Sequence, residues 1–223
     1  SRNVAMTLET LPAWSAFPGV GSFANVELDA LVARRRMCRS FLELPLGPGM
    51  LERALSLAGH APSAGNTQGW SFVVLEGTET MKFWEHEADS AWLAHPSHPG
   101  LLNAPAIVLP LASRDAYLAR YAEPDKVAVG AGRPGQWRVP YWLVDTAFAT
   151  MLLLLGLAQE GLGALFFALR KPPGPLLTQL GVPEGWEALG AVAVGWPSPD
   201  DQPTSSAGRP RRPASETVHW GRW

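Results

Sequence analysis

The feature that most constrains the fold is an apolar segment at residues 145–160, which runs into a second apolar stretch at 164–169. The first segment is apolar around nearly the whole circumference of a helix, which is typical of a central helix covered on all sides. Gln159 and Glu160 end the run before it reaches the ~18 uncharged residues that a membrane span needs. We therefore expect a buried helix followed by a strand, and no membrane partner.

The rest of the chain mixes helical and extended patterns. The expected helices span residues 26–38, with Asn25 as N-cap, and residues 50–60, 78–93 and 175–180; the expected strands span residues 70–75, 104–112 and 188–194. The polar, glycine-rich residues 115–140 form either a mobile lid or a helix with a long loop, and the pattern does not decide between them. Mixed elements without βαβ alternation indicate an α+β sandwich.

A single domain is expected, because 223 residues suffice for one large core and would be cramped as two. Residues 1–25 predict an irregular N-terminal arm, and residues 26–223 predict the domain. Its tail, residues 198–223, carries Val218, Trp220 and Trp223, which indicates that it docks on the domain or on a partner. Hydrophobic residues make up 47% of the chain and charged residues only 17%, so we expect apolar surface to be buried between subunits.

Composition and spacing argue against several functional classes. The formal net charge of -2 provides no field for nucleic acid, and none is expected as a partner. One cysteine, Cys38, excludes an internal disulfide and fits a cytoplasmic protein. The GxGxxA pattern at residues 19–24 lacks the preceding strand of a dinucleotide site. His95 and His98 lack the spacing of metal ligands, so a metal-dependent hydrolase is the weakest hypothesis.

Two arginine clusters and one loop are the informative motifs. The first cluster ends the first helix and consists of Arg34, Arg35, Arg36 and Arg39. The second lies near the C-terminus and consists of Arg209, Arg211 and Arg212. A solvated cationic helix end explains the first cluster alone, but two such clusters brought together repel unless an anion such as phosphate lies between them. The small residues of loop 61–70 can closely approach a flat ligand.

The segments RRRMCRSF, APSAGNTQGW, GLGALFFAL and the late RPRRP occur in the order and spacing of the nitroreductase-like flavoprotein family, which the chain resembles from about Leu28 onward. The strongest match is PSxxNxQxW at residues 62–70, which is similar to the family's PSSxNxQPW. The resemblance implies an α/β sandwich with a mainly antiparallel central sheet flanked by helices. It also implies an intertwined homodimer with two FMN sites at the subunit interface.

The resemblance further implies which residues bind FMN. The phosphate, ribityl chain and pyrimidine edge are expected to contact Arg35, Arg36, Met37 and Arg39, and the late basic residues at the phosphate are expected to be Arg211 and Arg212. The loop that covers the cofactor from the second subunit is expected to contribute Pro62, Ser63, Ala64, Asn66 and Gln68. The segment facing the isoalloxazine ring and its N5 is expected to be Phe167, Ala168 and Leu169. Met37, Ala64 and Gly69 depart from the family's pattern, which implies fewer hydrogen bonds to FMN.

The resemblance implies an FMN-dependent NAD(P)H oxidoreductase, in which NADH or NADPH delivers hydride to flavin N5 and is replaced by a small, electron-poor nitroaromatic or quinone. Such a cycle needs no acid or base from the protein, and no catalytic residue is assigned. Trp137, Tyr141 and Trp142 could line the mouth of the pocket, and core packing explains them as well. The alternatives are a flavin-binding or storage protein and an FMN enzyme of another reaction type.

Overall fold

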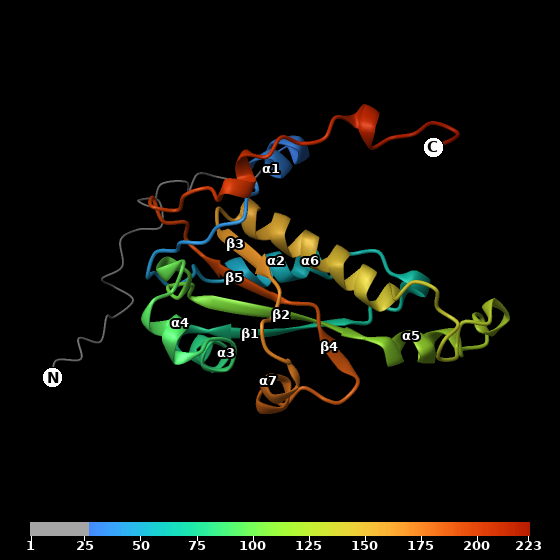
Figure 1. Cartoon of the computed structure of the whole chain (residues 1–223). Coiled ribbons are helices and arrows are strands. Elements are labelled where there is room, and N and C mark those ends of the chain that lie inside the picture. The colour runs from blue at the N-terminus through green and yellow to red at the C-terminus, as the bar shows by residue number, and fades with distance from the viewer. Residues whose placement is uncertain (1–26) are drawn as a thin grey trace.

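The computed structural model describes residues 27–223, and its centre is one five-stranded sheet with the strand order β1-β2-β5-β3 and β4 paired to β2 (Figure 1). Every strand pairing is antiparallel. All eight residues of β2 are buried, so both faces of the sheet are covered at its middle. The strands are β1 (Trp70–Glu76), β2 (Ala106–Ser113), β3 (Gly163–Phe167), β4 (Trp186–Ala188) and β5 (Ala191–Gly195). The expected α+β fold with a mainly antiparallel sheet is confirmed.

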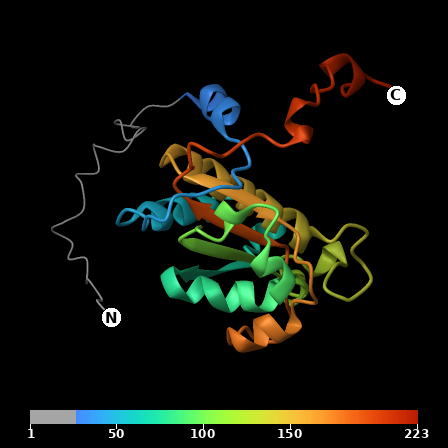
Figure 2. The same ribbon diagram turned by 60° about the vertical axis from the view of Figure 1, so that its left-hand side comes forward.

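Helices cover both faces of the sheet (Figures 1 and 2). α2 and α6 pack on each other and on one face, while α3 and α7 lie on the other. Because strand side chains alternate between faces, β2 and β5 supply two separate hydrophobic cores. The helices are α1 (Leu28–Arg34), α2 (Met50–Ala58), α3 (Thr80–Glu87), α4 (Ser90–Ala94), α5 (Arg114–Tyr121), α6 (Tyr141–Gln159) and α7 (Gly174–Gln179).

The expected central helix is α6, which begins at Tyr141, a turn earlier than its apolar pattern indicates. Its length and composition would suit a membrane-crossing helix, but half of this segment is buried within the fold. Gly156 lets α2 approach closely, since a Cβ there would lie only 2.9 Å from the Cα of Ala54. α6 is therefore a core helix, and one of the two hydrophobic cores forms between α6, α2 and the sheet.

Two expected helices differ in the structure, and one strand was not expected. The first helix ends at Arg34, because the chain then becomes extended and pairs with β3 at Met37 and with Pro197 at Phe41; its expected cap, Asn25, lies outside the described residues. The helix expected over 78–93 is divided into α3 and α4, because Ala88 is extended and Asp89 accepts a hydrogen bond from the N–H of Trp92. β4, with three residues, is too short to show a pattern.

The structure describes two segments whose conformation or docking the sequence did not decide. Residues 115–140 are a helix, α5, followed by a long loop that contains one short 3-10 turn at Val127–Val129. The tail extends away from the sheet beyond α1 (Figures 1 and 2), and Trp220 and Trp223 are 90% and 98% exposed. The aromatic residues of the tail therefore do not dock on their own domain, and docking on a partner stays a prediction. The arm at residues 1–25 lies outside the described residues.

Candidate functional site

The first arginine cluster lies where α1 gives way to an extended segment beside β3. Met37 forms a parallel bridge with Ala164, and the N–H of Cys38 donates to the carbonyl of Ala164 at 2.9 Å. The N–H of Phe166 contacts the sulfur of Met37 at 3.5 Å. This pairing carries the arginines of residues 34–36 to the point where α6 ends and β3 begins.

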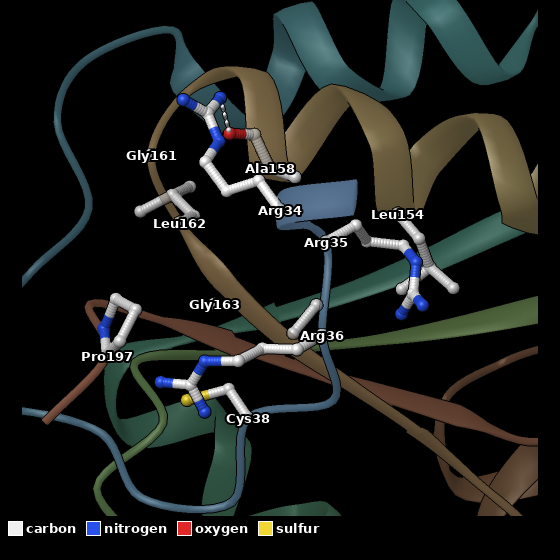
Figure 3. A pocket seen from close by; sticks show the side chains of 11 residues that line it. Arg34, Arg35, Arg36, Cys38, Leu154, Ala158, Gly161, Leu162, Gly163 and Pro197 are labelled. Carbon is white, nitrogen blue, oxygen red and sulfur yellow. Dashed lines mark hydrogen bonds between the residues drawn. The ribbon is translucent and has the colours of Figure 1, made fainter. Parts of the chain in front are cut away.

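A pocket of about 240 Å³ opens at this point (Figure 3). Glycine backbone and apolar side chains form its floor, and three consecutive arginines extend over it in different directions. Its lining residues are Arg34, Arg35, Arg36, Cys38, Leu154, Ala158, Gly161, Leu162, Gly163, Ala164 and Pro197. The concentration of positive charge over a concave apolar surface suits an organic anion.

The three arginines are held differently. Arg34 donates from Nη2 to the carbonyl of Ala158 at 2.8 Å, near the C-terminal end of α6. Arg36 pairs with the carboxylate of Asp201. Arg35 has a buried Nη1 for which residues 27–223 offer no hydrogen-bond partner. A buried donor without an acceptor is rare in folded proteins, and on a guanidinium it is best satisfied by an anionic oxygen. Arg35 is therefore the side chain that most needs a ligand.

Asp201 fixes the segment on the other side of Arg36. Its Oδ1 accepts the backbone N–H groups of Arg39 at 2.7 Å and Ser40 at 2.9 Å, and only 8% of the residue is exposed. Burial alone would raise the pKa of Asp201, but the hydrogen bonds from Arg39, Arg36 and Ser40 and the charge of Arg36 outweigh it, so the pKa lies below its ordinary value. Asp201 is therefore ionised at neutral pH.

Arg39 faces a different hollow from Arg35. Its Nη1 donates to the carbonyl of Met37 at 3.3 Å, and its side chain lines an open cleft of about 740 Å³ together with Ser40, His98 and Asp201. Arg35 and Arg36, expected at the phosphate, and Arg39, expected toward the pyrimidine edge, therefore lie on one segment. Their side chains line two different pockets.

Cys38, between these arginines, is buried. Burial foremost, and then the negative charge of Asp201, raise the pKa of Cys38 to about 12. The thiol therefore stays protonated at neutral pH and is a packing residue rather than a nucleophile.

The loop at residues 62–68 is held in a specific conformation by α5 and α6. Asp145 accepts the N–H of Ala64 at 2.8 Å and the hydroxyl of Tyr117 at 2.7 Å, and burial followed by this bond raises the pKa of Tyr117. Asn66 and Gln68 both have φ in the left-handed region, at 52° and 51°. Such angles are uncommon for residues with side chains and persist where surrounding contacts impose them.

The side chains within this loop also bind one another. Ser63 Oγ accepts the N–H of Gln68 at 2.9 Å, and the amide of Gln68 donates to Asn66 Oδ1 at 3.1 Å. Pro62 is exposed. The loop lies at the end of α6 marked by Asp145, whereas Arg34 lies at the end marked by Ala158, and 13 helical steps separate the two by about 20 Å. One chain therefore does not bring the loop and the arginine pocket together.

The segment after β3 is supported from the opposite layer. Phe167 stacks on Trp84 with ring centroids 6.2 Å apart, and buried Glu87 accepts the N–H of Arg170 at 2.6 Å. Ala168 and Leu169 lie between these two anchors. The segment expected to face the flavin ring is thus fixed at both ends by α3.

The late arginines lie apart from the arginine pocket. Arg212 pairs with Glu216 within the tail at 3.2 Å, and neither Arg211 nor Arg212 lines the arginine pocket. Across the described part of the chain, no group of three His, Cys, Asp or Glu side chains is placed to hold a metal ion.

Comparison with known protein families matches residues 32–196 to the nitroreductase family. The chain belongs to this family. It is 26% identical over 172 residues to an Archaeoglobus fulgidus protein named as a candidate NADH dehydrogenase/NAD(P)H nitroreductase, covering 75% of this chain and 83% of that protein. A shorter match of 51 residues, 43% identical, joins 23% of this chain to 22% of 4-nitrobenzoate reductase from Pseudomonas putida. A solved structure of iodotyrosine deiodinase bound to FMN and 3-iodo-L-tyrosine aligns with a TM-score of 0.61 and 21% identity, over 88% of this chain and 100% of that one.

In this nitroreductase-family chain, sequence reasoning located the arginine segment, the loop and the end of β3, but missed the side chains that hold them. These are Asp201, Asp145, Tyr117 and Glu87. Asp145 had a visible signal, since it is the one acidic residue at the start of an otherwise apolar helix. Asp201 had none, because it lies in a polar, proline-rich stretch among other acidic and hydroxyl residues.

Proposed function

We propose that this chain is an FMN-dependent oxidoreductase that takes hydride from NADH or NADPH and passes it to a small, electron-poor organic compound of nitroaromatic or quinone type. The observation that carries the proposal is the buried, unpartnered Nη1 of Arg35 in the arginine-lined pocket beside β3. A flavin phosphate would satisfy this donor. Membership of the nitroreductase family and the FMN-bound relative support the same cofactor.

The residues present fit FMN along the extended segment. Arg35 and Arg36 would bind the phosphate, and Met37 and Arg39 would follow the ribityl chain toward the pyrimidine edge. The backbone of residues 167–169 would face the ring. Bound FMN supplies a hydride acceptor and donor at its ring, so the chain's own residues need only bind, orient and shield it. The late residues Arg211 and Arg212 would reach the phosphate only if the tail moves or if they come from a second copy.

We also propose that two copies complete each site as a homodimer. The arginine pocket, at about 240 Å³, is smaller than the roughly 300–1,000 Å³ of usual small-molecule sites. The loop that carries Pro62, Ser63, Ala64, Asn66 and Gln68 lies at the far end of α6 within its own chain. Apolar side chains remain exposed on α1 and α6, and these are Leu28, Val32, Phe148 and Met151. A second copy packed on α6 would cover them and bring its loop to the pocket.

An aromatic cluster beside this loop supports an aromatic substrate. Rings surround Trp137, and Tyr121 of the cluster lies against the loop, since a Cβ at Gly65 would be 3.0 Å from its ring. The members, with centroid distances from Trp137, are Tyr121 at 4.7 Å, Tyr141 at 5.6 Å, Tyr117 at 5.8 Å and Trp142 at 6.5 Å. Electron-poor rings stack favourably on such side chains, so the cluster would lie at the mouth of a site formed by two copies.

Replacing Arg35 tests the proposal. Arg35→Gln removes the charge and keeps a polar but shorter side chain, and a lost charged hydrogen bond of about 1.5–3 kcal/mol corresponds to roughly 10- to 150-fold weaker binding. We expect this loss for FMN and almost none for riboflavin, which has no phosphate. Dissociation constants are measured by the change in flavin fluorescence on titrating the apoprotein.

The matched control is Arg53→Gln, because Arg53 is exposed and pairs with Glu160, and neither residue lines the pocket. FMN affinity in this variant is expected to match the unaltered protein. Equal FMN affinity in Arg35→Gln and Arg53→Gln would remove Arg35 from the phosphate site and, with it, the main support for the proposed cofactor.

A further inference from the structure

Asp201 is the buried acid that joins the C-terminal tail to the arginine segment. Its side chain is 2% exposed, and its two oxygens contact donors on three residues, Arg36, Arg39 and Ser40. A buried carboxylate needs such partners, because an ionised group without them would carry a large desolvation cost. Within residues 27–223 no other acidic side chain pairs with Arg35, Arg36 or Arg39, so Asp201 is the acid that governs this cationic segment.

The backbone brings Asp201 to this place by a short antiparallel pairing. Phe41 bridges Pro197, the N–H of Leu42 donates to the carbonyl of Trp196, and the N–H of Ser198 donates to the carbonyl of Ser40, the last two at 2.9 Å. The chain then turns, and the N–H of Asp201 donates to the carbonyl of Ser198 at 3.0 Å. Asp201 is thus positioned by residues 196–198, which follow β5, and by the arginine segment that it holds.

The consequence for the arginines is preorganisation. Consecutive guanidinium groups repel one another and carry much side-chain freedom, both of which oppose a fixed binding geometry. Asp201 holds Arg36 at the wall of the pocket beside Pro197 (Figure 3) and fixes the backbone on which Arg39 is mounted. A ligand that meets side chains already in place loses less affinity to ordering them.

We propose that Asp201 is a positioning residue for the anion site: it holds the Arg36 guanidinium and the backbone of Arg39 and Ser40 so that the ligand phosphate meets a preformed set of donors. The identity of that ligand as FMN rests on the proposed function above. The fixed backbone does not depend on the ligand at all.

Two substitutions of Asp201 separate the functions of its two carboxylate oxygens. Asp201→Asn keeps an oxygen for the N–H groups of Arg39 and Ser40 but offers Arg36 no negative charge, whereas Asp201→Ala removes both functions. Asp200→Asn is the matched control, because Asp200 is the exposed neighbouring acid and has no ion pair in the described part of the chain.

The first readout is flavin affinity. Because fixing one flexible side chain is worth roughly 0.5–1.5 kcal/mol, Asp201→Asn is expected to weaken FMN binding about 2- to 12-fold. Riboflavin affinity should stay unchanged. Arg36→Gln should lose at least as much, because it also removes a phosphate contact, and the double variant should lose no more than Arg36→Gln alone, because the charge of Asp201 acts through Arg36. Losses that add, or FMN affinity in Asp201→Asn equal to or above that of Asp200→Asn, would overturn the role assigned to the charge.

The second readout is amide hydrogen exchange of the flavin-free protein. Arg39 and Ser40 amides should lose protection in Asp201→Ala and keep it in Asp201→Asn, with Asp200→Asn unchanged. Unaltered protection in Asp201→Ala would contradict the positioning role. A protein that binds no FMN would defeat the proposed function instead, and amide exchange would still decide whether Asp201 holds the segment.

Discussion

At the scale of single residues, three neighbouring arginines have three different tasks. Arg34 closes the end of α6, Arg36 pairs with Asp201, and Arg35 is left with a buried, unpartnered donor. The sequence predicts the cluster, but it cannot predict this division, because the partners lie 124 and 165 positions away along the chain. The sequence shows which residues are arginines, whereas the tertiary structure decides which partner each arginine binds.

The lowered pKa of Asp201 predicts a dependence of stability on pH. A carboxyl whose pKa is lower in the folded state stabilises the fold fully above its unfolded pKa of about 3.9, and this contribution is lost as the pH falls through the folded value. Asp201→Asn should therefore lower the free energy of unfolding by about 1–3 kcal/mol at pH 7, and the gap to the unaltered protein should shrink below pH ~4. Urea unfolding across this range measures it. A gap that grows toward low pH would contradict the argument.

At the scale of elements, the close approach of the arginine segment to β3 is what forms the pocket. The sequence predicts β3 and the central helix well, because a long apolar run in a folded protein forms a buried helix or strand. It does not predict the pairing of Met37 and Cys38 with β3, since one bridge and a few hydrogen bonds leave no periodic pattern. Gly163 marks the approach, because it is the position where β3 begins and where Cys38 lies nearest.

Gly163→Ala tests this element-scale account. The added Cβ would lie 2.9 Å from the Cβ and Sγ of Cys38 and 3.0 Å from Pro197, so the segment must move off β3. We expect overpacking to cost about 1–3 kcal/mol of folding free energy, and FMN affinity to fall with it. Thermal unfolding and flavin titration measure the two effects.

Gly174→Ala is the matched control for this substitution. A Cβ on Gly174, in α7, meets nothing within 4 Å, and alanine favours a helix. The stability of this variant should be equal or slightly higher. If Gly163→Ala behaves in the same way, the close packing of β3 against Cys38 does not constrain the pocket.

At the scale of the whole molecule, one chain holds two incomplete halves of a site. The arginine pocket and the loop at residues 62–68 lie at opposite ends of α6. The sequence resemblance predicts both motifs, and only the fold reveals the separation between them, because it depends on the length and direction of one buried helix. The exposed apolar side chains of α6 are the surface where a second copy would join the halves.

Met151→Glu tests this arrangement. Met151 is 40% exposed on α6, and burying a charge there against a second copy would be costly. We expect the dissociation constant of the homodimer to rise at least about tenfold, with FMN lost in parallel, by sedimentation velocity and flavin content. Met81→Glu, at a methionine 46% exposed on α3, should leave the dimer intact. A dimer that survives Met151→Glu, or a native protein that is monomeric yet binds FMN, would contradict the shared site.

The most direct test of the central claim is the visible absorbance spectrum of the protein reconstituted with FMN, recorded without oxygen before and after NADH or NADPH is added. The account predicts yellow flavin bands that bleach within the turnover time and return when a nitroaromatic or quinone is supplied. Bound flavin that keeps its bands with both nucleotides would indicate a storage protein or another reaction. No bound flavin after reconstitution would contradict the assignment of the arginine pocket itself.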